Sequence, residues 1–136
     1  MPNPLSTIKP QKIMDFFTVK KPPYVPLLWK ILVQVPQPPE KIGSFYVPDS
    51  TRDENEFGCY VGYVAAVGQF AYTAVTKAGI DMNEMERKPS RGDWVIFGRH
   101  AGEKIKTKDG TLWIKMADTE IDGIVQDPDV FDCIRL

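Results

Sequence analysis

Histidine and cysteine, the side chains most typical of nucleophilic and transition-metal sites, occur at only three scattered positions in this chain. His100 is the only histidine, and a lone imidazole beside a turn usually serves as a surface or hydrogen-bonding residue. Its sequence neighbours do not suggest a Ser-His-Asp or Cys-His catalytic set. Cys59 and Cys133 stand far apart without a Cys-x-x-Cys pairing, so we expect two free thiols packed as small apolar residues.

Three acidic residues near the C-terminus are the best candidates for a metal site. Asp118, Glu120 and Asp122 alternate in the sequence, which would place them on one face of a strand. A hard cation normally needs further oxygen ligands from elsewhere in the fold, so a solvated turn is the simpler interpretation. The chain also lacks the GxxxxGKS or GxxxxGKT pattern of a phosphate-binding loop. We therefore predict no catalytic residues, no metal and no cofactor, and a protein that is not an enzyme.

An apolar tripeptide inside a polar loop is the most informative feature of the sequence. Residues 36–57 are rich in proline and charge, yet Phe45, Tyr46 and Val47 follow one another in their middle. Three consecutive apolar residues on a solvated loop indicate a contact with something else. That contact is made either with another protein or with the chain's own folded body, and the sequence leaves both open.

Length and charge limit the partners of the chain. A chain of 136 residues has room for one domain and can bury a core without disulfides or metals. The formal net charge is −1, so we expect neither nucleic acid nor an anionic membrane as a partner. Residues 1–20 lack the apolar run of a secretory signal, and no segment has the roughly 20 apolar residues that span a membrane. We expect a cytoplasmic protein.

The first 26 residues form a proline-rich arm. Proline disfavours a long helix or a central strand there, and a short apolar cluster lies between the prolines: Ile13, Met14, Phe16, Phe17 and Val19. Such a segment either docks its aromatic side chains on the folded body or on a neighbour, or stays disordered.

The first strong strand covers residues 27–35. Every second side chain from Trp29 to Val35 is apolar, while Lys30 and Gln34 point the other way, which predicts a strand with one buried face. The prolines that follow end the strand, because proline cannot donate to a β-ladder.

Further short strands follow, separated by turn residues. We expect them at 59–67, 93–97, 103–107, 111–116 and 121–125. Gly62 interrupts the second strand, which is typical of a bend in a small closed barrel. The excursion 68–92 contains a segment, 70–80, that fits either a short helix or a wide hairpin. The pattern predicts an all-β barrel or sandwich over residues 27–126, followed by a tail at 127–136.

Five stretches of the chain, in order, also resemble GroES-type co-chaperonins. The clearest is RGDWVIFGRHAG at 91–102, which is similar to the family's VGDxVIFxxYAG. GYVAAVG at 62–68 is similar to GxVxAVG, and residues 26–35 lie where the family has PLxDRVLVK. The other two are 103–114, which resembles the (V/I)K…DGEEYLIL hairpin, and 118–125, which resembles xxDILAVI.

This resemblance implies a small irregular β-barrel (GroES-like) with a long loop after the first strand and with N- and C-terminal extensions. It implies that the barrels assemble into a heptameric homo-oligomer, and that the hydrophobic tripeptide of the loop binds a chaperonin ring (GroEL-like) and caps its cavity. By this likeness the partner-binding residues are Ile42, Gly43, Phe45, Tyr46 and Val47, where the family usually has GGI(V/I)L. The excursion 68–92 corresponds to the family's roof hairpin.

The chain also differs from the usual co-chaperonin. It has extensions at both ends, Ser44 in place of a loop glycine, and a bulkier, more aromatic tripeptide. In these respects it is similar to the extended versions encoded in some bacteriophage genomes. A second hypothesis is therefore a bacteriophage virion structural protein, which would be a capsid, decoration or neck component bound to other virion proteins. It would be found in the virion or the host cytoplasm. A third hypothesis is an unrelated small β-barrel enzyme or binding module.

Overall fold

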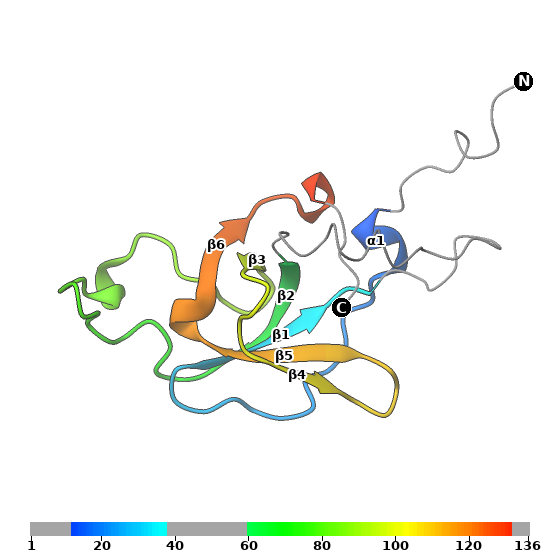
Figure 1. The fold of residues 1–136 in the computed structure, drawn as a ribbon, viewed down its shortest axis with the longest axis horizontal. Coiled ribbons are helices and arrows are strands. Elements are labelled where there is room, and N and C mark those ends of the chain that lie inside the picture. Colours follow the sequence, from blue (N-terminus) through cyan, green and yellow to red (C-terminus); the bar gives the residue numbers. More distant parts are fainter. Residues whose placement is uncertain (1–11, 38–59, 132–136) are drawn as a thin grey trace, which may run out of the picture.

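A computed structural model of the chain describes residues 12–37 and 60–131 (Figure 1). The loop segment with the predicted contact residues Ile42 to Val47 lies outside these ranges, and so do Cys59 and Cys133.

The described residues form mainly one antiparallel sheet of six strands, in the order β4-β5-β1-β2-β3-β6. The strands are β1 (Lys30–Val35), β2 (Tyr60–Val67), β3 (Trp94–Phe97), β4 (Glu103–Lys106), β5 (Leu112–Ala117) and β6 (Ile121–Val125). The short helix α1 (Ile13–Phe16) and the 3-10 turns η3 (Met82–Glu84), η4 (Asp118–Glu120) and η5 (Pro128–Val130) complete this part of the chain. The predicted all-β class is confirmed, and the strands lie close to their predicted positions.

The sheet is not closed into a barrel, in contrast to the prediction. β4 and β6 are the two edge strands of the sheet, and within the described ranges no strand pairing joins them. β4 exposes the charged side chains of Glu103, Lys104 and Lys106, which disfavours further pairing at that end. Part of the gap is bridged by a side chain, because Glu120 Oε1 accepts a hydrogen bond from the Gly102 amide at 3.2 Å.

The sheet curls around one apolar core, and β6 runs across the direction of β5 (Figure 1). The buried residues of this main core are Ile31, Val33, Val35, Tyr60, Val64, Tyr72, Met82, Val95, Phe97, Ile114 and Met116. Gly62 of β2 is required for close packing, because a Cβ atom there would lie 2.2 Å from Val33 Cγ1. The β-bulge between β1 and β2 lies elsewhere, at Leu32 and Val33.

β1 is buried on both faces, although its pattern predicted only one. Val33 and its alternate neighbours face the main core, whereas Leu32 lies on the opposite face with Ala65 and Trp113. Gln34 is also buried, with 4% of its surface exposed. The prediction of a solvated face is wrong at Gln34, where the N-terminal arm covers the strand, whereas Lys30 is exposed as predicted. Alternation along a strand carries no information about that cover.

A tight turn precedes β1 and delays its start. The Lys30 amide donates to the Leu27 carbonyl at 3.1 Å, and Leu28 has a φ of 56°. This turn (residues 27–30) reverses the chain before the strand begins. Trp29 is therefore 47% exposed and does not occupy the core position that the alternation predicted.

The excursion between β2 and β3 folds back on itself without a helix at 70–80. The Thr76 amide donates to the Ile80 carbonyl at 2.8 Å, and an isolated β-bridge closes the loop. Of the two predicted alternatives, a short helix and a wide hairpin, the observed structure is closer to the hairpin. Tyr72 and Met82 attach the excursion to the sheet, because both belong to the main core.

The two ends of the described chain pack against each other. Ile13 of α1 is 1% exposed, and its amide donates to Asp129 Oδ1 in the tail at 2.7 Å. From α1 the arm (residues 12–26) passes along the sheet and reaches the turn that leads back into β1 (Figure 1). No helix within residues 12–37 or 60–131 is long and apolar enough to cross a membrane.

Candidate functional site

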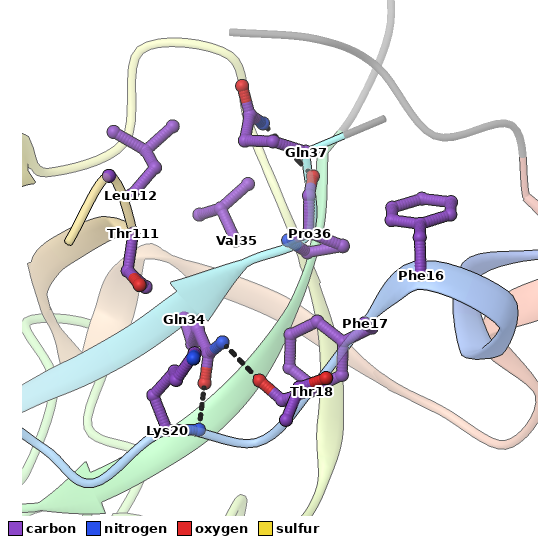
Figure 2. Close-up of a pocket in the computed structure, with 11 residues that line it drawn as sticks. Phe16, Phe17, Thr18, Lys20, Gln34, Val35, Pro36, Gln37, Thr111 and Leu112 are labelled. Carbon is purple, nitrogen blue, oxygen red and sulfur yellow. Dashed lines mark hydrogen bonds between the residues drawn. The ribbon is translucent and has the colours of Figure 1, made fainter. Parts of the chain in front are cut away.

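A groove of about 240 Å³ lies where β1 ends (Figure 2). The arm forms one wall, the end of β1 forms the floor, and the turn before β5 forms the other wall. The chain leaves this groove at Gln37 towards the loop that carries the predicted contact residues. The groove is therefore the described feature nearest to those residues along the sequence. Its geometry places none of Ile42, Gly43, Phe45, Tyr46 or Val47, which lie outside the described residues.

Gln34 holds the arm along the floor of the groove. Its Oε1 accepts a hydrogen bond from the Lys20 amide at 2.9 Å, and its Nε2 donates to the Thr18 carbonyl at 2.8 Å (Figure 2). The carboxamide thus pairs with one backbone donor and one backbone acceptor, as a neighbouring strand would. Because Gln34 is buried, these bonds satisfy groups that would be costly to leave unpaired.

An aromatic cluster fixes the arm beside the groove. Phe17 lies with its ring centroid 4.9 Å from that of Trp94 and 5.6 Å from that of Tyr63. Tyr63 and Trp94 are directly opposite each other in the β2–β3 ladder. Phe17 therefore shows that an aromatic residue of the arm docks on the chain's own sheet, one of the alternatives expected from the sequence.

The turn between β4 and β5 supplies the groove wall opposite the arm. Asp109 in this turn accepts hydrogen bonds from the Thr107 hydroxyl at 2.6 Å and from the Thr111 amide at 3.0 Å. These bonds, assisted by the charge of Lys20, lower the pKa of Asp109 from 3.8 to about 2. The carboxylate is thus a fixed negative charge near the positively charged Lys20 of the arm.

A second hollow, of about 460 Å³, lies between residues 24–28 of the arm and strand β5. Lys115 and Glu103 form an ion pair across its surface, with 3.3 Å between Nζ and Oε2. Burial raises the pKa of Tyr24, which lines the same hollow. His100 also lines it and is exposed, as expected for a surface histidine.

The acidic triplet does not share one face of a strand, so that prediction is wrong. Asp118 and Glu120 belong to the 3-10 turn η4, and only Asp122 lies in β6. Asp118 is buried, and its Oδ2 accepts a hydrogen bond from the Tyr72 amide at 2.8 Å. Glu120 Oε2 accepts from the Ala117 amide at 2.8 Å. Both carboxylates satisfy backbone donors, and residues 12–37 and 60–131 contain no group of three potential metal ligands.

Exposed apolar side chains gather around the turn at 27–30. Val25 is 79% exposed and Leu27 is 72% exposed, and Leu28 and Trp29 each expose about half of their surface. Phe70, at 52% exposure, lies beside them because its amide donates to the Leu28 carbonyl at 3.0 Å. Such a concentration of exposed apolar surface is typical of a contact site for another protein.

Two features of the described residues were not expected from the sequence: the burial of Gln34 and the pairing of Asp118 with Tyr72. The burial of Gln34 had no signal in the strand itself, because the alternation of β1 places Gln34 on the same face as the exposed Lys30. The pairing of Asp118 with Tyr72 also had none, since the two residues lie far apart in the chain and the second sits in the excursion.

Comparison with known proteins gives no family assignment. No protein-family model matches the chain, and no curated protein matches it either.

Proposed function

We propose that this chain is a GroES-like co-chaperonin that forms a ring and caps a chaperonin cavity through its loop. The observation that carries the proposal is the pairing of the two strands that flank that loop. β1 and β2 are adjacent antiparallel strands, so the segment between Val35 and Tyr60 leaves and re-enters the sheet at the same end. We propose that the apolar tripeptide between these strands binds a partner ring from that end of the molecule.

The proposed contact is made by Phe45, Tyr46 and Val47, with Ile42 and Gly43 preceding them. Burying each large side chain in a partner groove contributes roughly 1.5–3 kcal/mol. Ordering the loop costs about 1–2 kcal/mol for each residue that becomes fixed, so a single loop binds weakly. A ring presents several loops at once and raises the effective concentration of each, which makes binding both firm and reversible.

The fold supports a ring of small curved subunits. The sheet already curls around its core (Figure 1), and we propose that this open, curled sheet is an irregular variant of the GroES-like fold. The exposed apolar residues around the turn at 27–30 provide a surface for contacts between subunits. The function would be exercised in the cytoplasm, or in the host cytoplasm if the gene belongs to a bacteriophage.

Size-exclusion chromatography with light scattering tests this proposal. The protein is run alone and then with a purified GroEL-type chaperonin and nucleotide. We expect a ring that co-elutes with the chaperonin only when nucleotide is present. The double variant Phe45→Asp with Val47→Asp should keep the size of the ring and lose co-elution. Asn55→Asp, a charge change in the same loop outside the tripeptide, is the matched control and should still co-elute.

Two results of this experiment would contradict the proposal. If the double variant binds the chaperonin as well as the native chain does, the tripeptide is not the contact. If the native chain ignores the chaperonin under all nucleotide conditions, the capping role is wrong.

A structural subunit of a virion is the second candidate. The described parts of the arm and the tail favour it, because Ile13 bonds to Asp129 and Phe17 packs on Trp94. In a virion subunit we propose that these segments also bind neighbouring subunits. This candidate predicts an assembly of fixed size in the same chromatography experiment, with no response to chaperonin or nucleotide.

A further inference from the structure

The arm contacts the rest of the chain at a few separate points. Ile13 bonds to Asp129, Phe17 packs on Trp94, and the backbone near residue 20 bonds to Gln34. Between these points and the turn at 27–30, the described backbone of residues 21–26 donates no hydrogen bond to the sheet. Pro22, Pro23 and Pro26 restrict the backbone of that stretch, which bends at Pro23 and Tyr24. Pro26 is buried and Tyr24 lines the second hollow, so the arm is a docked module on a stiff connector that is held by side-chain packing and not by backbone donors.

The connector ends in a strained turn. Leu28 has a φ of 56°, in the left-handed region that leucine rarely occupies. The turn is held by four hydrogen bonds: the Lys30 amide donates to the Leu27 carbonyl, and the carbonyls of Leu28, Trp29 and Lys30 accept from the amides of Phe70, Asp118 and Gly68. If this turn opened, Leu28 would relax to extended backbone and the arm would point away from its own sheet. A short hinge under strain is a known cause of exchange between identical subunits.

We propose that residues 12–26 exchange between copies of this chain, so that the arm of one copy docks in the groove of the next, with the turn at 27–30 as the hinge. The receiving surface is known to fit this sequence, because it already holds the same residues within one chain. Every contact of the docked arm is preserved on exchange, and the strain at Leu28 is relieved.

The apolar surface at the hinge identifies a second copy as the partner. Leu27, Leu28 and Trp29 are exposed while the arm stays on its own chain. In a reciprocally exchanged dimer two opened hinges lie side by side, so these side chains cover one another. Exchange in a dimer therefore explains why such apolar residues stand at the hinge. It does not rest on the proposed chaperonin partner.

Cross-linking between two single-cysteine chains tests the exchange. Both chains carry Cys59→Ser and Cys133→Ser. One also has Lys20→Cys in the arm, and the other has Thr111→Cys in the opposite wall of the same groove. The two are refolded together, diluted and treated with a short bismaleimide. A cross-linked pair of unlike chains forms only when the arm of one copy lies in the groove of the other.

We expect this cross-linked pair in high yield. Replacing the Thr111→Cys chain by one with Lys77→Cys, an exposed position on the excursion, controls for random collision and should give little product. A single chain with both Lys20→Cys and Thr111→Cys reports docking within one copy. If that chain links only to itself and the mixed chains give no more product than the Lys77→Cys control, exchange does not occur.

Two substitutions at Leu28 test the hinge. Leu28→Gly accepts the positive φ without strain, so it should lower the yield of the mixed cross-link by about fivefold. Leu28→Pro cannot adopt that φ and should raise the yield. Equal yields for native, Leu28→Gly and Leu28→Pro chains would overturn the role of the hinge strain. Because no chaperonin is present, loss of exchange and failure of the capping role are distinguishable.

Discussion

At the scale of single residues, Asp118 shows how one buried carboxylate attaches a long excursion to the sheet. Its side chain accepts the Tyr72 amide at 2.8 Å, and its backbone carbonyl accepts the Tyr72 hydroxyl at 2.9 Å. Tyr72 takes a φ of 58°, which the two bonds and its place in the core hold in position. Burial, reinforced by the nearby charge of Asp118, raises the pKa of Tyr72 far above its usual range, so this hydroxyl remains a hydrogen-bond donor.

Replacing Asp118 should therefore destabilise the fold. Asp118→Ala leaves the buried Tyr72 amide without its acceptor, which costs about 1–3 kcal/mol, while Tyr72→Phe removes one hydrogen bond and costs about 0.5–1.5 kcal/mol. Urea unfolding measures both values. Asp122→Ala, on an exposed side chain of the same acidic stretch, is the control and should change the free energy of unfolding little. An Asp118→Ala chain as stable as this control would contradict the role of the bond.

Asp109 should contribute to acid sensitivity. Its folded-state pKa of about 2 lies below the ordinary value of 3.8, so the unfolded chain binds more protons between these pH values. The stabilising contribution is present above about pH 4 and is lost as the pH falls through about 2. Asp109→Ala lacks it at every pH. The difference in free energy of unfolding between the native and variant chains should therefore shrink from pH 5 to pH 2. A constant difference over this range would show that the hydrogen bonds to Asp109 do not depend on its charge.

At the scale of elements, β1 and β2 pack so closely at Gly62 that a larger residue there would clash with Val33. Gly62→Ala would place its Cβ 2.2 Å from Val33 Cγ1 and 3.0 Å from Phe97 Cε1, and overpacking of this kind costs about 1–3 kcal/mol. Gly98→Ala meets nothing within 4 Å and should be nearly neutral. Thermal unfolding of the two variants checks the contrast, and similar melting temperatures would mean that the strands move apart without cost.

The strands could be predicted from the sequence because their signals are local. Alternating apolar residues locate β1, and Gly110 with a φ of 88° forms the turn between β4 and β5. The features that could not be predicted depend on contacts between segments that lie apart in the sequence. The start of β1 was misplaced because nothing in the sequence marks Leu28 for a positive φ. Gln34 was assigned to solvent because the arm that covers it is remote in sequence. The open sheet likewise depends on which strands meet, and strand patterns do not specify this.

The candidate site also has one part that could be predicted from the sequence and one part that could not. The apolar tripeptide Phe45, Tyr46 and Val47 stands out by composition alone, so it could be proposed without a structure. The groove beside Gln34 could not, because its walls come from the arm, β1 and the turn before β5, which are brought together only by folding.

At the scale of the whole molecule, the described part of the arm contacts residues 128–130, so segments distant in sequence form one structure. The arm is held near residue 13 by Asp129 and near residue 20 by Gln34. Helix α1 has only four residues, too few to be stable on its own. We therefore expect the arm to detach as one unit when either attachment is lost.

This cooperativity has a direct test in amide hydrogen exchange measured by NMR. Asp129→Ala removes a charged acceptor, and the loss of about 1.5 kcal/mol should raise the exchange rate of the Ile13 amide by about tenfold. Because the arm detaches as a unit, the Lys20 amide, which Asp129 does not touch, should speed up as well. The Leu32 amide, inside β1, should keep its rate and report the intact sheet. If only Ile13 responds, the arm opens in independent pieces; if Leu32 also responds, the ends of the chain are needed for the stability of the whole sheet.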